Sequence, residues 1–228
     1  MQSIILLSGG LDSAVNTAIA KEKTEIAFVL TFDYGQHSAK KEMEASRKIA
    51  DFYKIPFRLM KLPWLGEITK SALCSHIKKL PTFEEKLPDD KKSLDEIAQQ
   101  VWVPNRNGLF INIAASFAES IDVDLIITGF NSEEGETFPD NSSDFINSIN
   151  QTLSFSTLKK CKVHSYTSDM NKKDIVKLGI EMNIPFDLIY SCYTGDEKMC
   201  GKCESCKRAI RAFEANGCME IIKRNFQT

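Results

Sequence analysis

The sequence has no apolar run close to the roughly 20 residues that a membrane-spanning helix requires. It also shows no charged leader followed by an apolar region and a cleavage site, so we expect a cytoplasmic protein without a membrane partner. Neither sign of charge dominates, because 29 Lys and Arg stand against 31 Asp and Glu. A large basic surface for RNA or DNA is therefore not expected. The three histidines lack the spacing of a metal site or a catalytic triad, and we assign them no role.

Two fingerprints of common nucleotide-binding folds are also missing. No Lys-Ser/Thr follows the glycines near the N-terminus, as it does in kinase and GTPase loops, and no G-x-G-x-x-G occurs. The turn that is present, Ser8–Ser13 (Ser-Gly-Gly-Leu-Asp-Ser), directly follows the apolar run 4–7. Its glycines let consecutive N–H groups curl toward an anion, and a helix beginning at Asp12 or Ser13 adds its N-terminal donors. The pattern predicts a phosphate site; the alternative is a tight turn without a ligand.

This S-G-G-x-D-S pattern resembles the loop of the ATP pyrophosphatase superfamily, whose members adenylate a substrate and release pyrophosphate. The resemblance implies that the loop holds the β- and γ-phosphates of ATP and leaves the α-phosphorus open to a carboxylate or amide oxygen. Asp12 is expected to help place Mg²⁺, and Ser8 and Ser13 to bond phosphate oxygens. The residues expected to line the ATP site are Leu7, Ser8, Gly9, Gly10, Leu11, Asp12, Ser13 and Ala14.

Apolar runs alternate with helical patterns along most of the chain, which is typical of a parallel sheet covered on both faces. Its 228 residues suffice for one α/β domain with an appendage or for two small domains. Residues 64–101 break the alternation with prolines and a charged run, and we interpret them as an insertion that either closes over a substrate or serves as a solvated spacer. The predicted strands are Ile4–Ser8, Glu25–Asp33, Phe57–Leu62, Asp124–Phe130 and Cys161–Tyr166, and apolar stripes predict helices within 43–53, 109–121, 145–153 and 175–182.

Seven cysteines, an odd number in a chain without an export signal, argue for thiols or metal ligands over a disulfide framework. Four of them form a C-x7-C-x2-C-x2-C pattern, in which two overlapping C-x-x-C steps and one outlying thiolate can surround a tetrahedral ion. Four sulfurs without an open position predict structural Zn²⁺. An iron–sulfur cluster is disfavoured because proline and the usual ferredoxin spacing are absent, and a redox C-x-x-C would be a lone pair. The predicted zinc ligands are Cys192, Cys200, Cys203 and Cys206.

With both motifs in view, the chain resembles the 7-cyano-7-deazaguanine synthases of queuosine and archaeosine biosynthesis over essentially its full length. The resemblance implies a doubly wound parallel five-stranded sheet with helices on both faces, here residues 1–185, and a small C-terminal zinc-binding part, residues 186–228. It also implies conversion of 7-carboxy-7-deazaguanine to the nitrile with ammonia and two ATP, through an amide intermediate, and a homodimer. The matching stretches are Ser8–Ser13, Thr31–Gln36, Val103–Asn107, Ile127–Phe130, Phe138–Asp140, Lys172 and the four clustered cysteines.

One stretch departs from the Tyr-Pro-Asp-Cys-Arg/Lys that is usual in bacterial members of this family. The chain has Phe-Pro-Asp-Asn-Ser at 138–142, and its acidic loop 129–140 is more similar to the archaeal branch. Substrate contacts at Asn141 and Ser142 are therefore not carried over.

Two cations are candidates for neutralising phosphate charge or the substrate carboxylate. They are Arg106 and Lys172, with Lys173 as a less favoured substitute for Lys172. Together with Asp12 they are the predicted catalytic residues.

The base is expected to meet carboxylates and aromatic rings. Asp33 or Asp140 is a candidate acceptor for the N–H groups of the guanine-like edge, because a carboxylate accepts two such donors. Tyr34 or Phe138 is a candidate for stacking on the base. The predicted substrate contacts are Asp33, Tyr34, Asn107, Gly129, Phe138 and Asp140.

The main alternative in the same superfamily is an enzyme that adenylates a tRNA base for thiolation or amination. Sulfur transfer generally requires a cysteine near the site, for which only Cys74 or Cys161 remains, and RNA binding favours a basic surface. A non-enzymatic zinc-knuckle protein on a degenerate nucleotide fold is disfavoured by the intact Asp12 and Ser13.

Overall fold

The computed structural model describes residues 1–227 and contains a five-stranded sheet in which every neighbouring pair of strands is parallel. The strand order is β3-β2-β1-β4-β5, so the first strand of the chain lies at the centre. The predicted α/β class with five parallel strands is confirmed. The strands are β1 (Gln2–Leu6), β2 (Glu25–Asp33), β3 (Phe57–Lys61), β4 (Leu125–Ile127) and β5 (Lys162–His164).

The predicted strands exist, but several of their predicted ends are wrong. Ser8 belongs to the loop after β1, and β4 ends at Ile127 instead of continuing to Phe130. The carbonyl of Phe130 accepts hydrogen bonds from the hydroxyls of Ser165, at 2.8 Å, and Thr167, at 2.7 Å. At Phe130, beyond the short β4, side-chain hydroxyls take the place of the strand-to-strand backbone hydrogen bonds. The chain leaves the sheet at this point.

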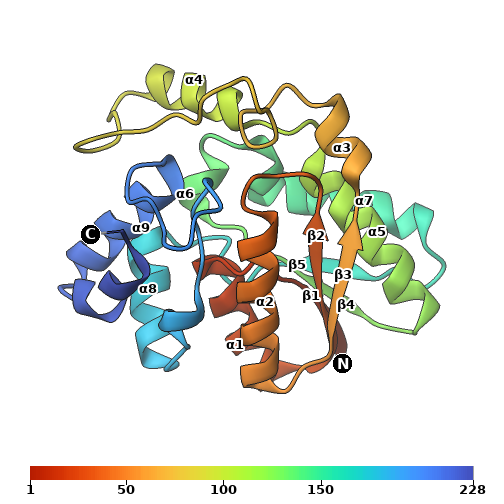
Figure 1. Cartoon of the computed structure of the whole chain (residues 1–228). Coiled ribbons are helices and arrows are strands. Elements are labelled where there is room, and N and C mark those ends of the chain that lie inside the picture. The colour runs from red at the N-terminus through yellow and green to blue at the C-terminus, as the bar shows by residue number, and fades with distance from the viewer. Residues whose placement is uncertain (228) are drawn as a thin grey trace.

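Helices cover both faces of the sheet, with α1, α2, α8 and α9 on one face and α5 and α7 on the other (Figure 1). Successive residues of one strand enter different cores: Ile4 packs with the α5 side and Ile5 with the α1 side. The doubly wound arrangement is therefore confirmed. The helices are α1 (Leu11–Lys23), α2 (Ala39–Tyr53), α3 (Pro63–Ile68), α4 (Lys91–Val101), α5 (Arg106–Ser120), α6 (Ser132–Gly135), α7 (Ser143–Ser156), α8 (Lys172–Glu181) and α9 (Glu204–Ala215), with short 3-10 turns at 139–141, 186–188, 219–221 and 223–225.

The strand order places a switch in winding direction beside β1, because β2 and β3 lie on one side of it and β4 and β5 on the other. Open α/β sheets bind ligands in the crevice outside the carboxyl ends of the strands at such a switch. The loop after β1 contains Ser8–Ser13, and the loop after β4 contains Thr128 and Gly129. The predicted phosphate loop therefore lies where this fold places a ligand.

The segment 64–101 and the C-terminal part both pack onto the rest of the molecule. The segment forms much of α3 and all of α4 and passes over the end of the sheet toward which the strands point (Figure 1). The N–H of Phe83 in this segment donates to the carbonyl of Lys202 at 2.9 Å. Phe213 and Phe226 from the C-terminal part share a core with Ile5. The proposed domain boundary at residue 185 remains a prediction.

Candidate active site at the carboxyl ends of β1 and β4

The loop between β1 and α1 is shaped by two glycines at close approaches. Gly9 has a φ of +79°, and a Cβ there would lie 2.8 Å from the Cβ of Ala45. A Cβ on Gly129, at the end of β4, would lie 2.7 Å from the backbone nitrogen of Ser13. Only glycine allows α2 and β4 to come this close to the loop. The N-terminus of α1 is consequently held against the end of β4.

Three backbone N–H groups of this loop donate long hydrogen bonds to serine hydroxyl oxygens. The N–H of Ser8 donates to Ser13 Oγ at 3.3 Å, that of Gly10 to Ser8 Oγ at 3.4 Å, and that of Leu11 to Ser191 Oγ at 3.3 Å. These distances exceed the usual 2.9–3.0 Å of an N–H···O bond. The donors converge beside a helix N-terminus and can be taken over by stronger acceptors such as phosphate oxygens.

A cavity opens beside this loop and collects most of the predicted site residues. Its lining also includes apolar side chains from β2 and α5, such as Phe32 and Phe110. Five predicted residues, Gly9, Leu11, Ala14, Asp33 and Asp140, lie outside the lining, and their proposed roles remain predictions. The predicted residues that line the cavity are Leu7, Ser8, Gly10, Asp12, Ser13, Tyr34, Arg106, Asn107, Gly129, Phe138 and Lys172.

Lys172 is buried between two carboxylates, whereas its neighbour Lys173 is exposed. Its Nζ forms ion pairs with Asp12 and, at 2.7 Å, with Glu134. Burial raises the pKa of Asp12 to about 6, against the opposing effect of Lys172. Burial also lowers the pKa of Lys172, but the two carboxylates outweigh this effect and raise it above its usual value. The ammonium is therefore charged and anchors Asp12 at the start of α1.

The cavity wall contains polar atoms without a protein partner. Among residues 1–227, the buried side-chain atoms without a hydrogen bond are Asp12 Oδ1, Thr128 Oγ1 and Asn131 Nδ2. Asp12 and Thr128 line the cavity. Buried polar atoms rarely stay unpaired, so these oxygens indicate a ligand or an ion. A carboxylate oxygen beside a phosphate loop suits Mg²⁺, and Asp12 therefore fits the predicted metal role.

Arg106 begins α5 and lines the cavity without an ion pair to any of residues 1–227 within 4.0 Å. Its Nη1 donates to Tyr34 Oη at 3.1 Å, and its guanidinium lies 5.7 Å from the centroid of the Tyr34 ring. Burial raises the pKa of Tyr34 to about 12, so the partner is a neutral hydroxyl. The positive charge of Arg106 is thus available to an anionic ligand, unlike that of Lys172.

Several residues of the cavity were not predicted from the sequence. Glu134 lies in the acidic loop, where nothing local distinguishes it from its acidic neighbours. Glu42, Glu204 and Arg208 reach the cavity from α2 and α9. Glu204 stands directly between two predicted zinc ligands, and this position was the one local signal available. No cysteine among residues 1–227 lines the cavity.

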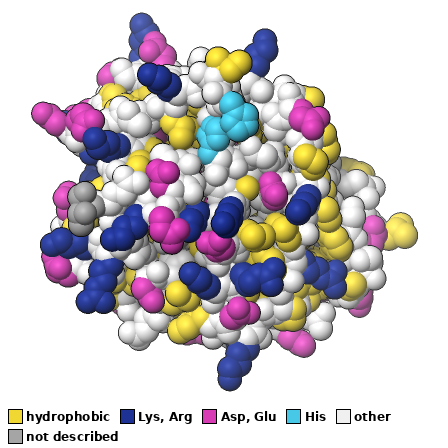
Figure 2. Space-filling view, viewed as in Figure 1, with side chains coloured by type: hydrophobic (Ala, Val, Ile, Leu, Met, Phe, Trp, Pro, Cys, Tyr) yellow, Lys and Arg dark blue, Asp and Glu magenta, His cyan; other side chains and the backbone are white. Residues whose placement is uncertain are grey.

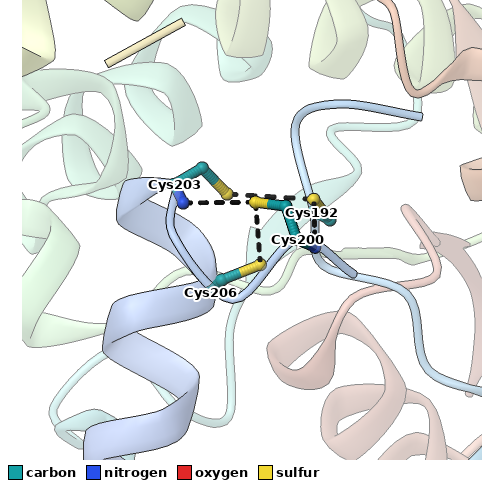
Figure 3. A group of neighbouring side chains, drawn as sticks. All are labelled: Cys192, Cys200, Cys203 and Cys206. Carbon is teal, nitrogen blue, oxygen red and sulfur yellow. Dashed lines mark hydrogen bonds between the residues drawn. The ribbon is translucent and has the colours of Figure 1, made fainter. Parts of the chain in front are cut away.

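The four clustered cysteines point toward one another from α9 and the loop before it (Figure 3). Their sulfur atoms all lie within 4.8 Å of one another. The sulfurs of Cys192 and Cys203 are 4.0 Å apart, as are those of Cys200 and Cys206. Such a set fits the tetrahedral coordination of Zn²⁺ by four thiolates at about 2.3 Å. The predicted metal-ligand set is therefore brought together.

The surface on the face shown in Figure 2 carries mixed charges. Lys and Arg side chains alternate there with Asp and Glu, without one continuous basic patch. Among residues 1–227, no helix is both long and apolar enough to cross a membrane.

Comparison with known proteins places this site in a family. A family model described as "Queuosine biosynthesis protein QueC" matches residues 2–217. The 7-cyano-7-deazaguanine synthase of Pelotomaculum thermopropionicum is 54% identical over 95% of this chain and 98% of its own length. The corresponding proteins of Desulforamulus reducens and the archaeon Methanosarcina mazei are 49% and 46% identical, each over 95% of both chains. Because both kinds of match span nearly the whole sequence, this chain belongs to the QueC family.

Proposed function

We propose that this protein is an ATP-dependent 7-cyano-7-deazaguanine synthase, a carbon–nitrogen ligase that forms a nitrile. The observation that carries the proposal is the 54% identity to a protein of that name over almost the full length of both chains. The expected substrate is 7-carboxy-7-deazaguanine, and the expected nitrogen donor is ammonia. We retain the cytoplasmic location and the homodimer as parts of this proposal.

In the proposed activation steps, different residues of the cavity bind ATP and the substrate carboxylate. A carboxylate is a poor electrophile until one of its oxygens carries AMP, after which ammonia can displace AMP. The loop Ser8–Ser13 would hold the β- and γ-phosphates, so that pyrophosphate leaves while the α-phosphorus faces the substrate. Arg106 would bind the substrate carboxylate through its otherwise unpaired charge. Activating the resulting amide oxygen in the same way would allow loss of AMP to leave the nitrile.

Two metal ions belong to the proposal. Asp12, with its unpartnered Oδ1, would hold Mg²⁺, which supplies charge neutralisation for the phosphates. The four clustered cysteines would hold Zn²⁺, which has no open position for catalysis and supplies structure.

The alternative activity is thiolation or amination of a tRNA base, and among residues 1–227 the cavity offers no thiol for the thiolation. Cys74, one of the two candidate thiols, lies outside the lining, and burial raises its pKa to about 11, so its thiolate is scarce at neutral pH. Cys161 lies outside the lining too.

The test combines purified protein with Mg²⁺-ATP, ammonium and 7-carboxy-7-deazaguanine. Mass spectrometry of the base should show the nitrile, and nucleotide analysis should show AMP. Formation of ADP in place of AMP, or no nitrile with zinc-loaded protein, would refute the proposal.

A further inference from the structure

Four carboxylates line the cavity, those of Asp12, Glu42, Glu134 and Glu204, and they differ in how fully their oxygens are partnered. Asp12 and Glu134 are held by Lys172 beside the phosphate loop. Each oxygen of Glu42 accepts one hydrogen bond, from Ser38 Oγ at 2.6 Å and from Gln36 Nε2 at 2.8 Å. Asp12 Oδ1 is unpartnered among residues 1–227, but it lies beside the phosphate loop and is assigned to Mg²⁺ above. Away from that loop, Glu204 has an oxygen with only one long hydrogen bond to the described part of the chain.

Glu204 is held firmly through only one of its oxygens. The side chain is 2% exposed, and its Oε1 accepts hydrogen bonds from Arg208 Nε at 3.0 Å and Arg208 Nη2 at 2.9 Å. Its Oε2 has a single partner among residues 1–227, Tyr193 Oη at 3.4 Å. An O–H···O bond is normally 2.5–3.0 Å long, so this partner leaves most of the acceptor capacity unused. A buried carboxylate oxygen at the wall of a cavity is well suited to an N–H donor of a ligand.

Neighbouring residues fix the position of Glu204 Oε2. Glu204 is the first residue of α9 and lies between Cys203 and Cys206, two ligands of the predicted zinc site. Arg208, one helical turn later, is itself tied to Glu133 at 2.7 Å. The backbone of Glu204 is held beside the predicted zinc ligands, and its carboxylate is held by Arg208. The carboxylate is therefore fixed in position before a ligand binds.

We infer that Glu204 is a specificity-determining residue that accepts a hydrogen bond from the 2-amino group of the deazaguanine base through Oε2. The inference rests on the proposed function, which supplies a base with an amino-lactam edge. The exocyclic 2-amino group projects further from the deazaguanine ring than the ring N–H does. We therefore expect it to be the donor that meets the single available oxygen, Glu204 Oε2. The role that the sequence suggested for Asp33 or Asp140 thereby passes to a carboxylate that lies in the cavity wall.

The test measures the dissociation constants of 7-carboxy-7-deazaguanine and of its analogue without the 2-amino group, by calorimetry on zinc-loaded protein. The wild-type protein should prefer the amino compound by about 10- to 100-fold, the range of a hydrogen bond to a charged group. In Glu204→Gln the amide oxygen stays with Arg208 and the amide NH₂ faces the amine of the base. Donor then meets donor, and the preference should disappear.

Two variants keep the test decisive. Glu42→Gln changes another buried carboxylate of the same cavity, whose oxygens already have partners, and should keep the preference for the amino compound. Tyr193→Phe removes the weak competitor for Oε2, and its preference should be at least that of the wild type. Zinc content and melting temperature report whether each variant is folded.

The outcomes separate this inference from the proposed function. A wild-type protein without preference, an unchanged preference in folded Glu204→Gln, or a lost preference in Tyr193→Phe would overturn the role of Glu204. If wild-type protein makes no nitrile from the acid, the proposed function fails instead.

Discussion

Lys172 is a buried cation of the cavity and Arg106 a half-buried one, and their surroundings give them different tasks. Lys172 is paired with Asp12 and Glu134, so its charge is already compensated and its main effect is to fix Asp12. Arg106 has only a neutral hydroxyl as its partner. An incoming carboxylate or phosphate therefore gains more from Arg106 than from Lys172. The sequence proposed both as equal candidates because a motif does not reveal which charges are compensated by distant residues.

Asp12→Asn should remove turnover while leaving the protein folded. The substitution keeps the size of the side chain but removes the charge that would hold Mg²⁺, and we expect a fall in kcat of at least about 100-fold. Lys172 keeps Glu134 as an ion-pair partner, so the buried charges remain balanced. AMP release gives the rate and thermal unfolding gives the stability. Near-normal turnover of Asp12→Asn would show that another residue holds Mg²⁺.

Arg106→Gln should raise KM for 7-carboxy-7-deazaguanine by about 10-fold or more, because the substrate carboxylate loses a charge-assisted partner. Tyr34→Phe is the matched control, since it removes the hydroxyl at 3.1 Å from Arg106 and leaves the charge in place. Initial rates at varied base and varied ATP measure the two KM values separately. An effect confined to the KM for ATP would assign Arg106 to phosphate.

At the scale of elements, α9 joins the metal site to the cavity. It carries the predicted zinc ligand Cys206 together with Glu204 and Arg208, and the ligand Cys203 is its N-cap residue. The cysteines were predictable because their spacing lies within one short segment. The ion pair of Arg208 with Glu133 could not be predicted, because 75 residues separate the two in the chain. Only the packing of α9 near the loop after β4 brings them together.

Cys206→Ser should destabilise the protein and weaken its binding of the base together. Loss of a ligand releases the first turn of α9, and with it Glu204. A loss of a few kcal/mol corresponds to a drop in melting temperature on the order of 10 °C in a domain of this size. Cys218→Ser is the control, because Cys218 is half-buried and lies outside the cluster. Metal analysis, thermal unfolding and calorimetry are the measurements. Equal behaviour of the two variants would contradict a zinc site.

Glu133→Gln should weaken the contact between α6 and α9 in a pH-dependent way. Burial raises the pKa of Glu133, but Arg211 and Arg208 outweigh it and hold the pKa below the usual value. A carboxylate with a lowered pKa in the folded state stabilises the protein fully above its unfolded pKa, about 4.3, and loses this effect as pH falls through the folded pKa. The variant should therefore be less stable than wild type by about 1–3 kcal/mol at pH 7.

Denaturant unfolding at pH 7, 5 and 3.5 measures this difference, which should shrink at the lowest pH. Glu220→Gln offers a comparison, because its pair with Lys223 at 3.4 Å is exposed and should contribute little at any pH. A difference for Glu133→Gln that is constant over the whole range would point to packing instead of charge.

For the whole molecule, the sequence predicted the sheet well and the cavity only in part. The central strands β1, β2 and β4 are recognisable as apolar runs because most of their residues are buried. The apolar stripes of α2, α7 and α8 are recognisable because one face of each helix is buried. The helices α3 and α4 were missed because prolines and charges mask their short apolar faces. No local pattern reveals which side chains from so many elements meet. The cavity is lined by residues of β1, β2, α1, α2, α4, α5, α6, α8 and α9.

The two activation steps should use this same cavity, because the structure places one S-G-G-x-D-S loop beside it. The amide that forms first would then be a substrate in its own right. Supplied in place of the acid, 7-carboxamido-7-deazaguanine should give the nitrile without ammonium and with one AMP per nitrile, whereas the acid should require ammonium and give two. Asp12→Asn should block both reactions alike, since each needs the same hold on the phosphates. Chromatography of AMP and mass spectrometry of the base measure the ratio. Two AMP per nitrile from the amide, or block of only one reaction by Asp12→Asn, would show that the steps do not share this site.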